Sequence, residues 1–299
     1  MDNLKGLVGV VSHDAGGAEV VAAYLSSREH QAILALKGPA ISVFERHFGH
    51  QYISSISEAI SRADWILTST GWQSNHEWIA VRDALSSGKK VVAFLDNWDD
   101  YRYRFWRDGE TALPNEIWVI DFQAKLLAEQ AFPNTLVRLV PVPELSNTVR
   151  DAHNLEIEKR GAPESGSVLF LSDNMNSHTP TIGPPAQYSD QESLVFLMNN
   201  LDFVKGVRLP IRIRLHPSER IENYDWALST FGTKLRVSKS VLLAEDLASH
   251  EIIVGSNSAA MVHAVKCGKR VLCCLDEKGM EPTIPMAGIE MLRDLQHEG

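Results

Sequence analysis

The chain has 299 residues, of which 44% are hydrophobic and 22% are charged, and its formal net charge at pH 7 is −9. These proportions are typical of a globular protein, and the length suits one large domain or two of about 150 residues each. The acidic balance argues against a nucleic-acid partner, since proteins that bind nucleic acids carry a basic surface.

The sequence also argues against a membrane span and against secretion. No stretch reaches the ~18 apolar residues that a spanning helix needs. The first apolar run is broken by His13 and Asp14, so it does not read as a signal peptide. Three cysteines, Cys267, Cys273 and Cys274, have neither zinc-binding nor disulfide spacing and are expected to be reduced core thiols. We expect a cytoplasmic protein with at most a weak peripheral contact with the inner membrane. The oligomeric state stays open.

The first half of the chain alternates short apolar strands with helical segments. Strands are expected at Leu7–Ser12, Ala32–Leu36, Ala63–Thr70, Val91–Asp96 and Ile117–Asp121, and helices at about Gly17–Ser27 and His76–Leu85. This alternation predicts βαβ units around a parallel sheet.

A charged stretch with proline on either side then interrupts the pattern. Such a composition is typical of a connection between domains. We predict a linker at residues 146–166, between an N-terminal domain of residues 1–145 and a C-terminal domain of residues 167–299.

The second half repeats the alternation. Strands are expected at Val168–Asp173, Ile211–Leu215, Leu235–Ser238, Glu251–Ser256 and Arg270–Asp276, and helices at Asp190–Leu201, Val241–His250, Ala259–Cys267 and in the tail after Pro285. Ser189 and Glu192 have the spacing of a capping box at the start of the first of these helices. The predicted fold class is therefore α/β, with two Rossmann-like, doubly wound parallel-sheet domains facing a cleft.

Polar residues follow the first strand, where an open parallel sheet binds its ligands. Gly16 and Gly17 allow close approach of the backbone to a ligand, and His13 lies beside them. Asp14 can act as a general base towards an acceptor hydroxyl, or it can simply cap the next helix. We place His13, Gly16 and Gly17 on the acceptor side of the predicted site.

Two later segments of the first half add candidates. Trp72 and Gln73 lie in a loop rich in hydroxyl and amide groups, which suits a sugar, although a turn with a core tryptophan is the simpler reading. Asp96 ends a strand and is the second candidate for the base. Arg102 belongs to the aromatic and arginine-rich segment that follows, and it can hold an anionic acceptor or extend into solvent.

The second half carries a second set of polar residues at strand ends. His216 and Pro217 follow the strand that contains Arg214, and Ser172 ends an earlier strand. We place these four residues on the donor side of the predicted site. A histidine at this edge can donate a hydrogen bond to a phosphate, and the proline fixes the turn.

A serine-rich loop follows a later strand. Ser256, Asn257 and Ser258 lead into the next helix, whose N-terminal N–H groups favour an anion. Capping of that helix by the same residues is compatible with binding, because both use the same backbone donors.

The His-Pro pair and this serine-rich loop, within Ile211–Leu275, resemble two motifs of bacterial glycosyltransferases of GT-B architecture. The likeness is to sialyl-, polysialyl- and Kdo transferases, which use CMP-activated acidic sugars. The resemblance implies that His216, Ser256 and Ser258 contact the nucleotide of the donor, and that a carboxylate of the N-terminal domain is the base. It also implies a metal-independent enzyme without cofactor. Its partners would be a nucleotide-sugar donor and a surface-glycan acceptor. His263 stands about where many such enzymes carry a glutamate for the donor ribose.

Three functional hypotheses follow. The first is a metal-independent glycosyltransferase with Asp14 or Asp96 as base and with His216 stabilising the departing phosphate. The second is an enzyme like the non-hydrolysing UDP-sugar epimerases, which share this architecture. The third is a non-catalytic nucleotide-binding subunit of the same fold, which His263 favours, because fold alone does not determine function.

Overall fold

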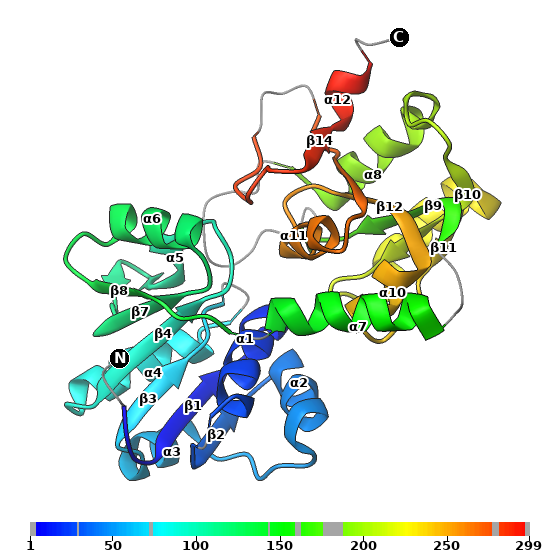
Figure 1. The fold of residues 1–299 in the computed structure, drawn as a ribbon. Coiled ribbons are helices and arrows are strands. Elements are labelled where there is room, and N and C mark those ends of the chain that lie inside the picture. The colour runs from blue at the N-terminus through cyan, green and yellow to red at the C-terminus, as the bar shows by residue number, and fades with distance from the viewer. Residues whose placement is uncertain are drawn as a thin grey trace. The chain divides into compact units, whose positions relative to one another are not determined.

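The computed structural model describes residues 4–28, 30–71, 74–142, 144–158, 163–175, 188–276 and 281–296. The chain divides into two compact units, and the boundary lies between Glu144 and Leu145. Each unit contains a six-stranded parallel sheet (Figure 1). None of the described helices combines the length and the apolar composition of a membrane-spanning segment.

The sheet of unit 1 has the order β2-β1-β3-β4-β7-β8. Its strands are β1 (Val8–Ser12), β2 (Ala32–Leu36), β3 (Trp65–Thr68), β4 (Lys90–Leu95), β7 (Glu116–Val119) and β8 (Leu136–Leu139). β1 pairs with β2 on one side and with β3 on the other. After β1 the chain forms β2 on one side of it and then crosses over to form β3 on the other side. This reversal of strand order makes a topological switch point between β1 and β3.

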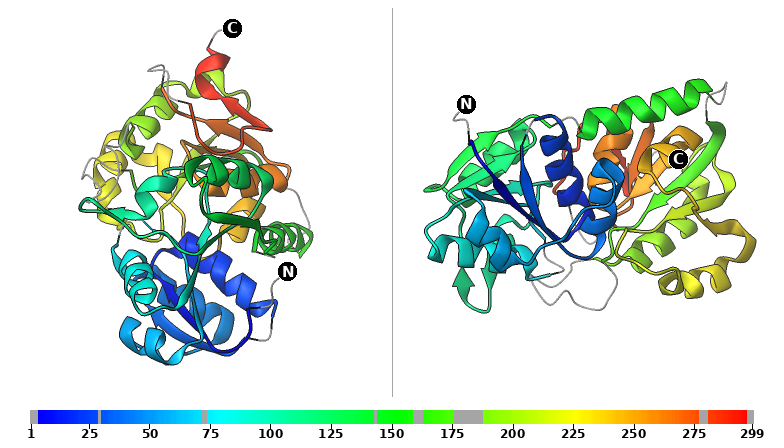
Figure 2. Two further views of the ribbon diagram at one scale, coloured as in Figure 1. Left: turned by 90° about the vertical axis from the view of Figure 1, so that its left-hand side faces the viewer. Right: turned by 90° about the horizontal axis from the view of Figure 1, so that it is seen from below.

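Helices cover both faces of this sheet. They are α1 (Ala15–Ser26), α2 (Pro39–Phe48), α3 (Ile56–Arg62), α4 (His76–Ser86), α5 (Tyr101–Arg104) and α6 (Phe122–Ala131), and a two-stranded hairpin is formed by β5 (Trp106–Arg107) and β6 (Glu110–Thr111). α1 and α2 lie side by side, as the two blue helices in Figure 2 show. All five residues of β1 are buried, because a central parallel strand is covered on both faces.

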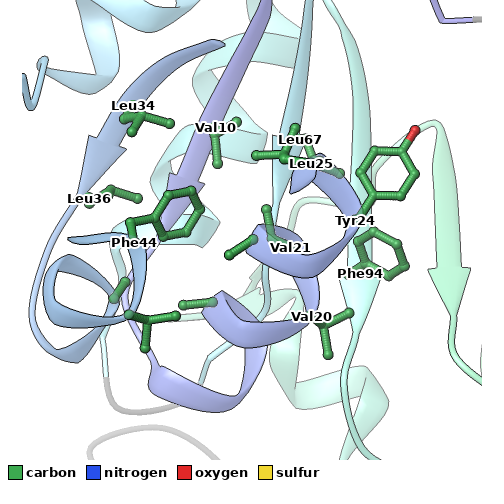
Figure 3. Packing of buried hydrophobic residues seen from close by; sticks show 14 of the residues in the cluster. Val10, Val20, Val21, Tyr24, Leu25, Leu34, Leu36, Phe44, Leu67 and Phe94 are labelled. Carbon is green, nitrogen blue, oxygen red and sulfur yellow. The ribbon is translucent and has the colours of Figure 1, made fainter. Parts of the chain in front are cut away.

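The core of unit 1 lies in two layers, one on each face of the sheet. Figure 3 shows the layer beneath α1 and α2, where Val10, Val21 and Phe44 meet. The other layer is formed beneath α3 and α4 by residues such as Ile66 and Val81. These layers hold the strands rigidly, so the loops at the carboxyl ends of the strands start from fixed positions.

The sheet of unit 2 has the order β11-β10-β9-β12-β13-β14. Its strands are β9 (Glu164–Leu171), β10 (Arg208–Arg214), β11 (Leu235–Val237), β12 (His250–Gly255), β13 (Arg270–Cys273) and β14 (Ile289–Met291). The helices are α7 (Glu144–Glu158), α8 (Asp190–Asn199), α9 (Asp225–Phe231), α10 (Leu243–Ser249), α11 (Ala259–Lys266) and α12 (Leu292–Leu295). This strand order is that of a dinucleotide-binding Rossmann sheet, and its switch point lies between β9 and β12.

Several predicted elements differ from the observed ones. Most of the predicted linker, 146–166, is helix: α7 covers Glu144–Glu158, and β9 starts at Glu164. The predicted tail helix is first a strand, β14, which joins the sheet edge beside β13, and only then the short α12. The capping box of Ser189 and Glu192 at the start of α8 is confirmed.

Candidate functional site

The switch point of unit 1 gathers polar side chains from several elements. Ser12 ends β1 and is followed by His13 and Asp14. Ser69 and Thr70 follow β3, Asp96 follows β4, and Glu77 lies in the first turn of α4. Parallel strands end at one edge of the sheet, so these residues meet although they are far apart in sequence. We call His13, Asp14, Glu77 and Asp96 the acidic site.

Glu77 is the most buried member of the acidic site, with only 3% of its surface exposed. Its Oε1 accepts the backbone N–H of His13 at 2.7 Å and the hydroxyl of Ser69 at 3.1 Å. Its Oε2 is buried and has no hydrogen-bond partner among the described residues. Burial, followed by the negative charge of Asp14, raises the pKa of Glu77 from 4.5 to about 7. Glu77 can therefore exchange a proton near neutral pH.

His13 and Asp14 form a hydrogen-bonded pair, with 2.7 Å between Nδ1 and Oδ1. The bond to Asp14 raises the pKa of His13, although burial opposes it. Since a carboxylate accepts, Nδ1–H of the neutral imidazole donates, which leaves Nε2 as the basic nitrogen. Asp14 stands at the N-cap of α1, but its side chain makes no capping bond within the described structure. Capping by this side chain, one of the two predicted roles, is therefore not observed.

Four glycines leave room for these side chains. A Cβ on Gly71 would lie 2.3 Å from Oδ2 of Asp14, and one on Gly38 would lie 2.7 Å from Nε2 of His13. A Cβ on Gly16 would approach Oδ2 of Asp96 to 2.8 Å, and one on Gly17 would approach Cβ of Ser69 to 2.5 Å. Gly16 and Gly17 thus serve the site by giving space to its own side chains.

Asp96, the second predicted base, pairs with a buried arginine. Nη1 of Arg104 lies 3.4 Å from Oδ1 of Asp96 and donates to the carbonyl of Thr70 at 3.2 Å. Burial raises the pKa of Asp96, while the Arg104 charge counteracts this effect. Arg102, the predicted acceptor-binding arginine, is exposed on α5 instead. Of the two arginines, Arg104 is buried and reaches Asp96, because the turn of α5 points it inwards, so the acceptor-binding role of Arg102 stays a prediction. Trp72 and Gln73 lie outside the described residues.

In unit 2, the strand ends gather a second polar group. The hydroxyl of Ser172 donates to Oε2 of Glu219 at 2.5 Å and accepts from the hydroxyl of Tyr224 at 2.7 Å. The same Oε2 accepts the backbone N–H of His216 at 2.9 Å. Sequence analysis did not select Glu219 or Tyr224. The three-residue spacing from His216 to Glu219, typical of local side-chain bonds to the backbone, could have indicated the first.

The His-Pro turn is held locally. The N–H of Glu219 donates to the carbonyl of His216 at 2.8 Å, which closes a turn with Pro217 at its second position. Nδ1 of His216 lies 2.6 Å from Oγ of Ser218, and Asn174 donates to the same oxygen at 2.9 Å. The histidine ring is therefore oriented by its surroundings.

The three residues of the serine-rich loop after β12 differ in burial and in hydrogen-bond partners. Ser256 is fully buried, and its hydroxyl donates to Oγ of Ser193 at 2.7 Å, so it supports the loop from within. The backbone N–H of Asn257 donates to Oδ2 of Asp173 at 3.0 Å. Ser258 is the N-cap of α11 and accepts the N–H of Ala260.

Arg214 makes none of the contacts described for Ser172, His216 and the serine-rich loop. Its Nη1 pairs with Oδ2 of Asp246 at 2.6 Å, and it donates to backbone carbonyls of residues 240–242. Among the described residues, no group of three or more histidine, cysteine, aspartate or glutamate side chains has the arrangement of a metal site.

No protein-family model and no curated protein sequence matches this chain. Solved structures of similar fold do match, across both units. A glycosyltransferase from Rickettsia africae ESF-5 has a TM-score of 0.52 at 12% identity, covering 90% of this chain and 79% of that one. A protein from Listeria monocytogenes, assigned as a UDP-N-acetylglucosamine 2-epimerase, has a TM-score of 0.57 at 13% identity, covering 97% and 86%. An α/β-galactoside α-2,3-sialyltransferase from Photobacterium phosphoreum has a TM-score of 0.51 at 7% identity, covering 97% and 99%. The chain therefore has the two-sheet α/β fold of GT-B glycosyltransferases.

Proposed function

We propose that this protein is a glycosyltransferase that moves a sugar from a nucleotide-sugar donor to an acceptor hydroxyl. The observation that carries the proposal is the acidic site of unit 1, where a histidine–aspartate pair lies beside a glutamate with a pKa near 7. The likeness of fold to several glycosyltransferases supports the same reaction class.

The reaction needs one proton removed from the acceptor hydroxyl. In our proposal the His13–Asp14 pair removes it, with Nε2 of His13 or the free oxygen of Asp14 as the accepting atom. The acceptor oxygen then bonds to the anomeric carbon, the bond from that carbon to the donor phosphate breaks, and the nucleotide leaves with the bonding electrons. Asp96 is the weaker candidate for the base, because Arg104 neutralises it.

Unit 2 supplies the donor side of the proposal. His216 and the N-terminus of α11, with Asn257 and Ser258, are proposed to stabilise the negative charge of the departing phosphate. Ser172, Pro217 and Ser256 hold the shape of these loops. The finer proposal is a CMP-activated acidic sugar as donor and a surface glycan as acceptor. It is supported by the His-Pro and serine motifs and by the sialyltransferase among the similar structures.

The base is tested by Asp14→Asn with Asp121→Asn as the matched control. Asp121 also follows a strand of the same sheet, but it caps α6 by accepting the N–H of Ala124, and asparagine caps equally well. We expect transfer to fall by roughly 10²–10⁴-fold in Asp14→Asn and to persist in the control. Full transfer by Asp14→Asn would remove this residue from the mechanism.

The donor is tested by thermal stabilisation with CMP, CDP, UMP, UDP and GDP in the absence of metal. A ligand that binds only the folded protein raises its melting temperature by mass action. We expect a shift with CMP that disappears in His216→Ala. A shift with UDP alone would replace the CMP-sugar donor with a UDP-sugar, and no shift with any nucleotide would contradict nucleotide-sugar transfer.

The second candidate function is epimerisation of a UDP-sugar. It is favoured by the nearness of two proton-exchanging groups, Glu77 and the His13–Asp14 pair, because epimerisation removes a proton from carbon and returns one. The similar Listeria monocytogenes structure is assigned as such an enzyme. Conversion of UDP-N-acetylglucosamine to its C2 epimer without an acceptor would establish this function over transfer.

A further inference from the structure

β10 has an unusual second face. Ile211 and Ile213 are buried in the core of unit 2, whereas Arg212, between them, is exposed and Arg214 is half-buried. β10 lies inside the sheet, between β9 and β11. An interior strand of a parallel sheet is normally apolar on both faces, because helices cover both. The arginines show that this face of β10 meets something polar.

The arginine on this face has a like-charged neighbour. Arg212 is in register with Leu169 of β9 on one side and with Arg236 of β11 on the other. Register partners in a parallel pair project from the same face, and like charges in adjacent positions destabilise a sheet. Arg236 donates to the carbonyls of Gly232 and Leu235 and lines neither cavity, so Arg212 is the member of this pair that a ligand in the cavities can meet.

Two adjoining cavities lie over this face. They have volumes of about 260 and 530 Å³ and share Arg212, Ser249 and His250 in their walls. The smaller is lined by the first residues of β9, β10 and β12, and the larger by the loop after β11 and by α10. None of Ser172, His216 and Ser258, at the carboxyl ends of β9, β10 and β12, lines either cavity.

Most charges around the cavities are already paired. Arg214 pairs with Asp246, Arg208 pairs with Glu164, and Glu245 accepts the backbone N–H groups of residues 241 and 242. Arg212 and Lys239 form no ion pair with any residue that the structure describes. The walls therefore carry two cations without an ion-pair partner in that part of the chain, together with the carboxylate of Glu245, which binds backbone N–H groups only.

The rim of the larger cavity is held in place. Arg214 donates to the carbonyls of Ser240, Val241 and Leu242, which fixes the loop that carries Lys239. Ser238 donates to Oδ1 of Asp246 at 2.6 Å, on α10. The site is thus built by side chains that bind the backbone of its own wall.

His250 adds a neutral hydrogen-bonding group. Its Nδ1 lies 2.7 Å from the carbonyl of Asp246, so Nδ1–H donates and Nε2 is the remaining nitrogen. Burial lowers the pKa of His250, with the positive charge of Arg212 acting in the same direction.

We propose that these cavities form a second binding site of unit 2, which takes a phosphate monoester on a small hydroxylated molecule. A phosphate monoester carries about −1.5 to −2 charges at neutral pH, which matches two unpaired cations better than a carboxylate does. Cavities of this size suit a sugar phosphate. None of the residues that the proposed transfer uses lines these cavities.

The test measures binding of inorganic phosphate, glucose 6-phosphate and glucose by calorimetric titration at constant ionic strength. We expect glucose 6-phosphate to bind, glucose not to bind, and Arg212→Met to weaken binding at least tenfold. Arg220→Met is the matched control: Arg220 is exposed in the same unit and lines neither cavity, so binding should stay within twofold. Equal binding of inorganic phosphate would support the site and identify free phosphate as its ligand.

Two results would overturn the proposal. One is unchanged binding of both phosphates by Arg212→Met, and the other is loss of binding in His216→Ala, which would place the phosphate at the donor loops. Without ligand, Arg212→Met should unfold at about the same temperature as the wild type, because Arg212 is exposed and forms no ion pair with any described residue. Loss of binding accompanied by a lower unfolding temperature would indicate a structural role for Arg212 instead.

Discussion

At the residue scale, the chemistry of unit 1 depends on the pKa values of Glu77 and His13, which their surroundings raise. Glu77 is enclosed and close to the negative charge of Asp14, so its pKa rises to about 7. His13 is held by Asp14, and its pKa rises for that reason. A carboxyl group with a pKa of about 7 and a histidine with a raised pKa thus lie next to each other, because the backbone N–H of His13 donates to Glu77. Such an arrangement is common at catalytic sites.

The raised pKa of Glu77 predicts a pH-dependent loss of stability. Between pH 4.5 and about 7 the folded protein holds a proton that the unfolded chain has released, so Glu77 lowers the stability as the pH rises through this window. Glu77→Gln lacks this titration. We expect the free energy of unfolding of the variant, relative to the wild type, to increase by about 1.4 kcal/mol per pH unit within the window. Urea denaturation from pH 5 to 8 measures the difference, and a difference independent of pH would contradict the raised pKa.

At the element scale, the first turn of α1 determines the space at the acidic site. Gly16 and Gly17 occupy successive positions of this turn and face different neighbours. Gly16 faces the carboxylate at the end of the Asp96 side chain, which can rotate, while Gly17 faces Cβ of Ser69, which cannot move without its backbone. The same substitution at the two positions therefore has different consequences.

Gly16→Ala and Gly17→Ala form a matched pair. Alanine favours a helix by up to about 1 kcal/mol over glycine, so Gly16→Ala should keep or raise the stability while the displaced Asp96 alters activity. Gly17→Ala should lose about 1–3 kcal/mol through overpacking. Urea denaturation of both variants, with an activity assay of Gly16→Ala, tests this. Equal stability of the two variants would show that Ser69 and its strand yield more easily than the contacts indicate.

At the scale of the whole molecule, each unit has a hydrophobic core of its own. Phe94 of β4 lies in a core formed by unit 1, and Phe170 of β9 lies in one formed by unit 2. Both side chains are fully buried. Domains with separate cores can unfold separately.

We therefore predict two transitions in scanning calorimetry. Phe94→Ala and Phe170→Ala should each remove about 3–5 kcal/mol from one unit and lower one transition while leaving the other in place. The transition lowered by Phe170→Ala should be the one that a bound nucleotide raises, because the proposed donor loops belong to unit 2. One cooperative transition lowered by both variants would contradict independent unfolding.

The sequence by itself determined the α/β class, most of the strands and the capping box of α8. Runs of apolar residues and the Ser189–Glu192 spacing are local patterns, and local patterns can be recognised in the sequence without knowing the tertiary fold. His13, Asp14 and Asp96 were also predictable as candidates, since each follows a predicted strand. The helix α7 was not, because its charged sequence resembles a connection and contacts such as that of Glu156 with Lys269 come from distant residues.

Only the tertiary structure decided which polar groups act together. Glu77 meets His13 across 64 positions, and Ser172 meets Glu219 across 47. Arg104, rather than Arg102, reaches Asp96 because of the direction of one short helix. The arginine pair of β10 and β11 depends on register. The physical reason is common to all four: strand order and packing set these distances, and neither is encoded in the spacing of residues along the chain.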